Sequence, residues 1–143
     1  MNDVYETLKL ENQLCFPLYA CSREVVKKYR PYLDELNLTY TQYITMIVMW
    51  DKKKVNVKEL GEILYLDSGT LTPVLKSLEA KGFVNRHRSE EDERVLIIDL
   101  TTKGEKLKEK AVTVPEHMSK YVNITEDEAD SLYHLLYKVL KGM

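Results

Sequence analysis

Two cysteines, Cys15 and Cys21, lie in the segment NQLCFPLYACSREVVKKY, which spans residues 12–29. A thiol can be oxidised, bind a metal or form a disulfide, and the ionised, reachable sulfur is the reactive form. If both cysteines lie on one helix, their spacing places them about 240° apart around its axis, so they cannot bridge within it. Each thiol is therefore either a reactive group or a buried, inert hydrophobic residue.

The residues around these thiols do not indicate a metal site or an enzyme. The histidines, His87, His117 and His134, have no metal-ligand spacing to one another or to the cysteines. We therefore expect no metal and no cofactor. A thiol peroxidase would need an activating cation and a dedicated resolving partner, and the sequence shows neither near Cys15. We predict that the protein is not an enzyme.

Composition favours one globular domain over residues 1–143. Hydrophobic residues make up 44% of the chain and charged residues 31%, with a formal net charge of −2. A nucleic-acid-binding protein with this net charge must concentrate its basic residues on one face. The longest apolar run, YITMIVMW, is far shorter than the roughly 18 residues that span a bilayer. The start, MNDVYETLKLEN, is acidic and polar, which argues against a secretory signal, so we expect a cytoplasmic protein without membrane contact.

The first third of the chain predicts two helices. Residues 9–33 carry helical apolar stripes, and Pro17 predicts a late start or a bend because it lacks an N–H group. Thr39 or Thr41 can cap the next helix, which runs through YTQYITMIVMW.

The middle of the chain predicts a short strand, two short helices and a hairpin. VNVKELGEILYL reads as the strand and the first helix, and DSGTLTPVLKSLEAKG as the second. Asp67 or Ser68 caps that second helix, Pro73 lies near its first turn and Gly82 ends it. FVNRHR and VLIIDL then flank a charged tip, the pattern of a β-hairpin.

The last third predicts more helices. Thr101 or Thr102 caps a long amphipathic helix in which Pro115 introduces a kink. Thr125 with Glu128 three residues later forms a capping signal before the final helix.

This order of elements predicts a mainly α fold with a small β-wing. A winged helix-turn-helix occupies about residues 40–100, and helices at 8–33 and 102–142 flank it. These long arms cannot bury their apolar faces on so small a central lobe, so we expect a homodimer in which the arms are dimerisation helices.

The middle segment supplies side chains suited to DNA. The second helix of a helix-turn-helix enters the major groove with its N-terminal residues facing the bases, and an arginine at a wing tip suits the narrow minor groove. The alternative is a simple helix start beside a solvated hairpin, but the combined order of elements disfavours it. The predicted DNA-binding residues are Asp67, Ser68, Thr70, Thr72, Pro73, Lys76, Arg86, Arg88 and Arg94.

The segment LGEILYLDSGTLTPVLKSLEAKGFVNRHRSEEDERVLIIDLTTKGEKL resembles the core of the MarR family of winged-helix repressors. The resemblance rests on the DER of the wing followed by LTTKG, and it extends over nearly the whole chain. It implies a homodimer that interlocks its first, fifth and sixth helices and binds double-stranded DNA at a pseudo-palindromic operator. It places the recognition helix at about 68–81 and the wing at about 85–98. It also assigns Arg94 to the minor groove, with Asp92 as its orienting partner.

The N-terminal segment LCFPLYACSREVVKKYRPYLDELNLTYTQY is similar to the OhrR/SarZ group of organic hydroperoxide sensors. This resemblance implies that Cys15 is the redox-sensing thiol, that Tyr29 and Tyr40 are its partners and that Tyr19 is a further neighbour. On one straight helix Cys15 and Tyr29 lie about 21 Å apart, so a tyrosine site using Tyr29 must be built across the dimer.

The chain has no cysteine after Cys21, which resembles the one-cysteine type of sensor. In that type the oxidised sulfur reacts with a small external thiol or proceeds to higher oxides. Cys21 lies on a stripe with leucines and is expected to pack. The alternative is that Cys21 of the other subunit acts as a resolving thiol.

These observations lead to one hypothesis and one main alternative. The hypothesis is a redox-sensing repressor that releases its operator when an organic hydroperoxide oxidises Cys15. The alternative is a MarR-type repressor gated by a small aromatic ligand, with Cys15 only structural.

Overall fold

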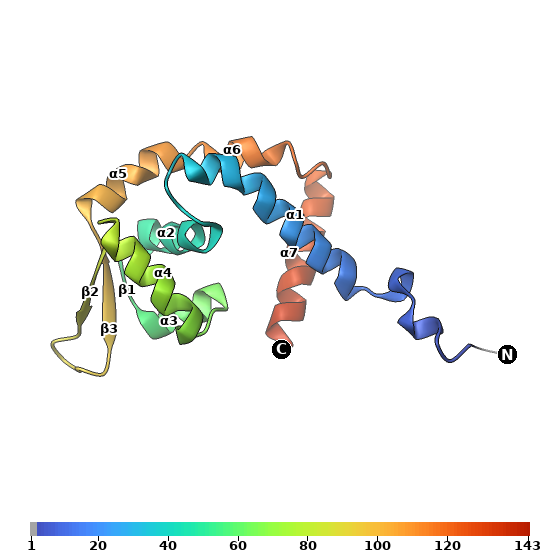
Figure 1. The fold of residues 1–143 in the computed structure, drawn as a ribbon, viewed down its shortest axis with the longest axis horizontal. Coiled ribbons are helices and arrows are strands. Elements are labelled where there is room, and N and C mark those ends of the chain that lie inside the picture. Colours follow the sequence, from blue (N-terminus) through green and yellow to red (C-terminus); the bar gives the residue numbers. More distant parts are fainter. Residues whose placement is uncertain (1–2) are drawn as a thin grey trace.

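The computed structural model describes residues 3–143 as a chain of helices around one small antiparallel sheet (Figure 1). The predicted fold class, mainly α with a β-wing, is confirmed. The elements are the 3₁₀ turns η1 (Glu6–Leu8) and η2 (Leu10–Asn12), the helices α1 (Cys15–Asp34), α2 (Tyr40–Lys52), α3 (Val57–Leu64), α4 (Ser68–Ala80), α5 (Thr102–Ala111), α6 (Val114–Ser119) and α7 (Glu126–Lys141), and the strands β1 (Lys54–Asn56), β2 (Val84–Arg88) and β3 (Leu96–Leu100).

Side-chain caps set the starts of the central helices. Thr39 and Gln42 form a reciprocal capping box at α2, with each side chain bonded to the other residue's backbone N–H. Asn56 accepts from the Glu59 N–H at 2.7 Å at the start of α3. Asp67 accepts from the Thr70 N–H, also at 2.7 Å, at the start of α4. Each cap satisfies backbone donors that the helix itself leaves unpaired.

The core lies where α2, α3 and α4 pack together and against the sheet. Met46, Met49, Leu60 and Leu71 are completely buried there. At the edge toward α5, the indole N–H of Trp50 donates to the Gly104 carbonyl at 2.9 Å. A Cβ at Gly104 would overlap the Phe83 carbonyl oxygen, so only glycine lets the start of α5 approach this closely.

The wing follows directly from the end of α4. Gly82 has a φ of +82°, the left-handed conformation that glycine adopts without strain. The Phe83 N–H returns to the Leu78 carbonyl and the Gly82 N–H to Glu79, which closes the helix in a Schellman motif. In the sheet β3 lies between β1 and β2, and both pairings are antiparallel.

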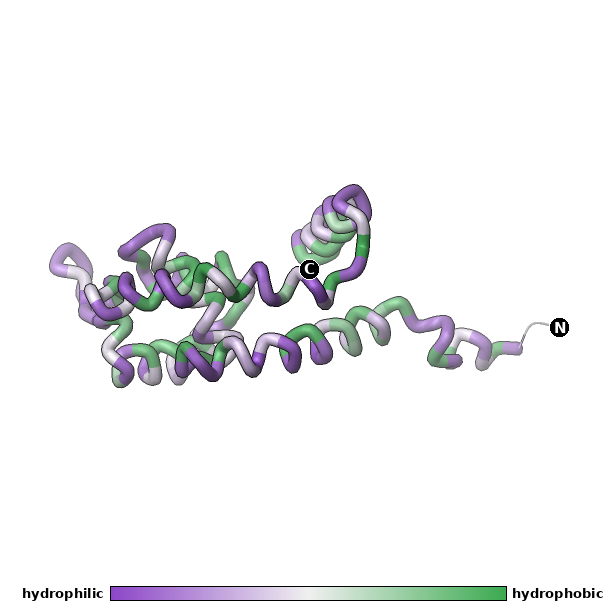
Figure 2. The backbone as a smooth tube through the Cα atoms, turned by 90° about the horizontal axis from the view of Figure 1, so that it is seen from above, coloured by the Kyte–Doolittle hydropathy of each residue, from purple (hydrophilic) through white to green (hydrophobic). Residues whose placement is uncertain are grey.

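Helices α2, α3 and α4 and the three strands form the central lobe. Helices α1, α5, α6 and α7 form arms that extend from it. Figure 1 shows α6 beside the C-terminal half of α1 and α5 over α2, while α7 turns back from the end of α6 and the N-terminus projects away from the wing. Leu33 is the only buried residue of α1, and α7 buries none. Figure 2 shows hydrophobic segments along both helices, which a single chain leaves exposed.

Prolines set two boundaries in these arms. Helix α1 begins at Cys15, six residues later than the apolar stripes alone indicate, so the late start predicted from Pro17 is confirmed. The single kinked helix predicted around Pro115 is wrong, because two helices, α5 and α6, meet there. Pro115 has no N–H to bond Ala111, so the chain breaks its helix before it and restarts.

Residues 3–143 contain no helix with the length and apolar character needed to cross a membrane.

Candidate functional site

The exposed face of α4 presents the residues predicted to meet DNA. Ser68, Thr70, Thr72, Pro73 and Lys76 are all exposed, while the leucines of the opposite face are buried. Helix α4 therefore divides into a packing face and a polar face. The DNA-binding role of that polar face stays a prediction.

Two of these polar residues are also used within the helix. The Thr72 hydroxyl donates to the Ser68 carbonyl at 2.7 Å. Backbone and side-chain hydrogen bonds from Thr70 hold the pKa of the Asp67 carboxyl below its usual value. Asp67 thus stays ionised as the helix cap.

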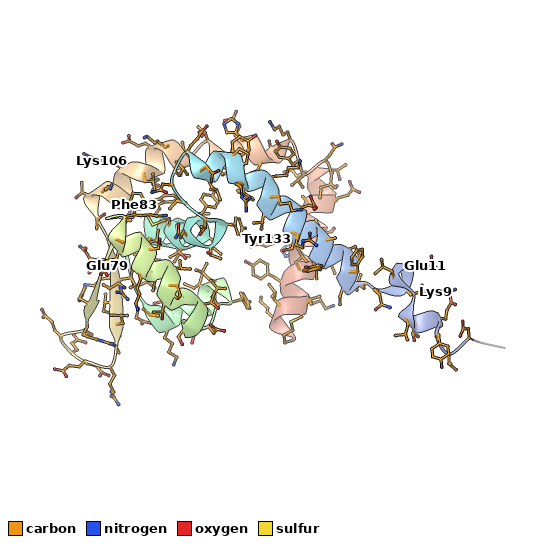
Figure 3. All side chains as sticks on the ribbon, viewed as in Figure 1. Lys9, Glu11, Glu79, Phe83, Lys106 and Tyr133 are labelled. Carbon is orange, nitrogen blue, oxygen red and sulfur yellow. The ribbon has the colours of Figure 1, made fainter. Side chains whose placement is uncertain are left out.

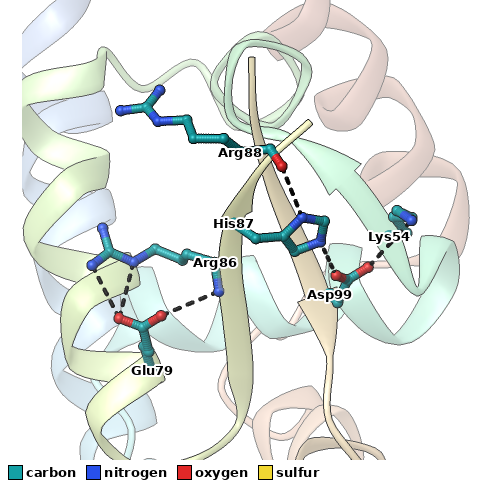
Figure 4. A network of polar contacts seen from close by, with 6 residues as sticks. All are labelled: Lys54, Glu79, Arg86, His87, Arg88 and Asp99. Atoms are coloured by element: carbon teal, nitrogen blue, oxygen red, sulfur yellow. Dashed lines mark hydrogen bonds and ion pairs between the residues drawn. The ribbon is translucent and has the colours of Figure 1, made fainter. Parts of the chain in front are cut away.

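Arg86 holds the wing against the recognition helix rather than extending into solvent. Its guanidinium donates to Glu79 Oε1 at 3.0 and 3.2 Å, and its backbone N–H donates to Glu79 Oε2 at 3.2 Å (Figure 4). The hydrogen bonds from Arg86 lower the pKa of the Glu79 carboxyl. The side chain of Arg86 is only 21% exposed, so its polar groups are used to join β2 to α4.

Arg88 and Arg94 are the exposed arginines of the wing. Figure 4 shows the side chain of Arg88 extending away from the polar network at the base of the hairpin. At the tip, the Arg94 side chain is 90% exposed and donates to Asp92 through Nε at 3.1 Å and Nη2 at 3.2 Å. Hydrogen bonds from Arg94 lower the pKa of Asp92. Asp92 thus contacts Arg94 directly. Its role as the orienting partner of a minor-groove arginine, which the resemblance implies, stays a prediction.

The base of the wing contains a polar network that the sequence did not reveal. The imidazole Nε2 of His87 pairs with Asp99 on the neighbouring strand (Figure 4). Lys54 Nζ, on the third strand, lies 3.9 Å from the other Asp99 oxygen. The register that places Asn85 opposite Asp99 was the missing information, because strand pairing is not encoded in either strand alone.

Both thiols of the described chain are free and exposed. Cys15 is the first residue of α1, where no side chain caps the helix. The unpaired N–H groups at such an end stabilise negative charge nearby. Cys21 is also exposed in the single chain, so the packing expected for it is not found within one chain.

Tyr29 and Tyr40 lie together, although they come from different helices. Their ring centroids are 4.9 Å apart, and Tyr43 joins them at 5.7 Å from Tyr29 and 6.3 Å from Tyr40. Burial raises the pKa of all three phenols, and that of Tyr43 reaches about 12. All three hydroxyls are therefore protonated at neutral pH.

Sequence reasoning missed Tyr43, and the available signal was its position one turn after Tyr40 on α2. Tyr19 lies outside this cluster. It is exposed one turn after Cys15, and the Arg23 guanidinium lies 5.4 Å from its ring centre.

Helix α1 separates the thiol from the tyrosine cluster. It runs unbroken from Cys15 to Asp34, so Cys15 and Tyr29 are about 21 Å apart along its axis. The N-terminal end of α1, which begins at Cys15, continues into the segment of Lys9 and Glu11. Figure 3 shows that this segment lies away from the lobe. One chain therefore brings together the three phenols but not the thiol.

Comparison with known proteins places this architecture in a family. A model for the transcriptional regulator SarA/Rot family matches residues 27–111. The organic hydroperoxide resistance transcriptional regulator of Bacillus subtilis is 48% identical over 143 residues, which is 100% of this chain and 97% of that protein. The chain belongs to the MarR family of transcriptional regulators.

Solved structures of MarR-family proteins share the whole fold. AbfR is a protein of Staphylococcus epidermidis. The structure of reduced AbfR bound to DNA matches this chain with a TM-score of 0.78 and 36% identity over 96% of both chains. The overoxidized form of AbfR bound to DNA has the same TM-score. A MarR variant from E. coli in complex with operator DNA has a TM-score of 0.82 and 26% identity, over 97% of this chain and 99% of that one. The MarR resemblance predicted from the sequence is confirmed.

Proposed function

We propose that this MarR-family protein is a homodimeric repressor that releases its operator when an organic hydroperoxide oxidises Cys15. The observation that carries the proposal is the arrangement along α1: an exposed thiol at one end and a cluster of protonated phenols at the other. Such a protein acts on DNA in the cytoplasm. The regulators of known function reported above support both DNA binding and redox sensing.

A homodimer accounts for the uncovered arms. Large apolar side chains are exposed along the first half of α1 and along α7, and a second copy would bury them. The apolar residues concerned are Leu14, Phe16, Leu18, Leu132, Tyr133, Leu135, Tyr137 and Val139. Packing between copies can also bring Cys15 of one chain to the tyrosines of the other, which one straight helix forbids.

In the dimer, two copies of α4 would enter successive major grooves of a pseudo-palindromic operator. The hydroxyl groups of Ser68, Thr70 and Thr72 are exposed at the end of α4 that would face the bases. Arg94 would enter the minor groove with Asp92 fixing its direction. Arg86 has its guanidinium occupied by Glu79, and in our proposal it positions the wing instead of contacting DNA.

The sensing chemistry follows from thiol reactivity. The Cys15 thiolate attacks the distal oxygen of a hydroperoxide, an S–O bond forms and the O–O bond breaks, which gives a cysteine sulfenic acid and an alkoxide. The alkoxide takes a proton from water and leaves as an alcohol. A small external thiol can then condense with the sulfenic acid to give a mixed disulfide and water. Protonated tyrosines can donate hydrogen bonds to the thiolate before the reaction. The added oxygen or thiol group would disrupt those hydrogen bonds and change the spacing of the two α4 helices.

The alternative, gating by an aromatic ligand, has weaker support. A cavity of about 240 Å³ lies between α1 and the α5–α6 arm. Typical small-molecule pockets measure roughly 300–1,000 Å³. The Tyr32 and His117 rings that line it already stack on each other with centroids 4.6 Å apart.

Operator binding under oxidation tests the proposal. Fluorescence anisotropy would follow an operator duplex, selected from genomic fragments by the reduced protein, during titration with cumene hydroperoxide. Wild-type protein and the matched control Cys21→Ser should both release DNA, while Cys15→Ser should bind DNA and ignore peroxide. Mass spectrometry would identify the oxidised form present at release, which matters because overoxidized AbfR is found on DNA.

Release of DNA from Cys15→Ser by peroxide would contradict the sensor assignment. Release by phenolic compounds in the absence of oxidation would favour the alternative.

A further inference from the structure

A buried amide on α2 connects the tyrosine cluster to the recognition helix. Gln42 is only 6% exposed and uses both ends of its side chain. Its Oε1 accepts from the Thr39 N–H at 3.0 Å as part of the α2 capping box. Its Nε2 donates to the Ser77 hydroxyl, on α4, at 2.9 Å. A residue of the α2 capping box is therefore also bonded to the recognition helix.

Lys81 makes a second connection at the end of α4. Its Nζ donates to Gln42 Oε1 at 2.8 Å and to the carbonyl of Asn37 at 2.6 Å. Asn37 lies in the connector between α1 and α2 and has a φ of +56°. Partial burial lowers the pKa of the Lys81 ammonium. The end of α4 is thus bonded to the segment that joins the helices of Tyr29 and Tyr40.

These contacts lie within one turn of Tyr40 and Tyr43 on α2. Tyr40 is the first residue of α2, between the cap Thr39 and the bridging Gln42. A displacement of the Tyr40 ring that moves the start of α2 must also move the acceptor shared by Thr39 and Lys81. Since packed cores do not deform continuously, such a shift would be passed to α4 as a rigid rotation.

We propose that Gln42 and Lys81 are positioning residues that couple the state of the tyrosine site to the orientation of the recognition helix. Neither residue contacts the thiol or belongs to the proposed DNA-binding set. The inference rests on the proposed function, because it needs a thiol-dependent release to transmit. In this inference, oxidation of Cys15 acts on α4 through the hydrogen bonds that Ser77 and Lys81 make with Gln42 and Asn37.

The test separates oxidation of Cys15 from release of DNA. The variants are Gln42→Met and Lys81→Met, which remove the polar groups at similar size, and the milder Ser77→Ala, which leaves the α2 cap intact. The matched control is Thr45→Val, because Thr45 is also buried on α2 but bonds only the Thr41 carbonyl of its own helix. For each protein we would measure the rate of Cys15 oxidation by mass spectrometry and the operator Kd before and after oxidation.

We expect oxidation rates within about twofold of wild type in all variants, because the thiol site is untouched. The ratio of oxidised to reduced operator Kd should fall at least about fivefold in Gln42→Met and Lys81→Met, the lower range of coupling between sites. The double variant should lose no more than either single one, since both act on one connection. Gln42→Glu should retain coupling, because its carboxylate can accept from Thr39, Lys81 and the Ser77 hydroxyl.

A wild-type release ratio in Gln42→Met, Lys81→Met and Ser77→Ala would overturn the coupling role alone. An equal loss in Thr45→Val would also overturn it, because the effect would then reflect general damage to α2. Wild-type protein that is oxidised at Cys15 and keeps its operator would overturn the proposed function together with this inference.

Discussion

The central lobe and the arms bury their residues very differently. Seven of the 13 residues of α2 are buried, whereas the 16 residues of α7 include none and the 20 of α1 include only Leu33. Both regions are helical and capped, since α2 and α7 each begin with a reciprocal capping box. Helix formation and burial are therefore separate matters in this chain.

The difference teaches which part of the molecule is complete by itself. The lobe has an apolar core, a three-stranded sheet and internal hydrogen bonds, so its geometry is set within one chain. The arms keep amphipathic faces whose partner must come from elsewhere, and helices gain most of their stability from such packing. In the proposed dimer, a thiol on the arms would then respond to changes between copies while the core of the lobe stays intact.

The largest expected effect is from a core deletion in the lobe. Leu75 is 1% exposed, on the packing face of α4. Leu75→Ala should lower the free energy of unfolding by about 2–5 kcal/mol, through lost burial and the remaining cavity. Urea denaturation followed by the fluorescence of Trp50 measures this change. A loss under 1 kcal/mol would mean that the lobe core is not the main source of its stability.

A matching deletion on an arm should act on association instead. Leu135 on α7 is 59% exposed in the single chain. If a second copy covers it, Leu135→Ala should weaken the dimer by about 1.5–3 kcal/mol, which is roughly 10- to 200-fold in Kd.

Sedimentation velocity over a range of protein concentrations measures this association. Ser131→Ala, an exposed change on the same helix, is the control and should leave the Kd unchanged. An unaltered Kd in Leu135→Ala would show that Leu135 lies outside the interface.

Local signals made much of the lobe predictable from the sequence. Caps were expected at Asp67 or Ser68, at Thr39 or Thr41, and at Thr125. Asp67, Thr39 and Thr125 do cap their helices, and such caps are predictable because they depend on residues within one turn. Pro17 similarly fixed the late start of α1. The α5–α6 break was underestimated, since a proline in a helical pattern can either bend a helix or end it.

Features that depend on packing between elements could not be predicted. Arg86 was expected on DNA as one of the arginines of the predicted hairpin. Its pairing with Glu79 could not be predicted, because it depends on how β2 lies against α4. Tyr43 completes the tyrosine cluster only once α1 crosses α2. The site around Cys15 is the least predictable, because Tyr29, its proposed partner, lies about 21 Å away along α1 of the same chain.

The smallest expected effect is on the pH dependence of the free energy of unfolding. It tests whether the lobe and the arms unfold together. Glu79 in the lobe and Glu128 in the α7 capping box both have a pKa lowered from 4.5, by hydrogen bonds from Arg86 and from Thr125 respectively. A lowered folded pKa contributes stability that is present above pH 4.5 and lost as the pH falls through the folded value. Each glutamate therefore makes its own region more sensitive to acid.

Trp50 is the single tryptophan of the chain and is buried in the lobe, so its fluorescence reports on that region. Glu79→Gln should flatten the fall in Trp50-detected stability below pH 4.5, because glutamine has no carboxyl to protonate. Glu128→Gln, which can preserve the capping box, should leave the Trp50 curve unchanged if the lobe unfolds independently of α7. Equal flattening by both variants would mean that the arms and the lobe form one cooperative unit, and that the contrast in burial does not divide the molecule energetically.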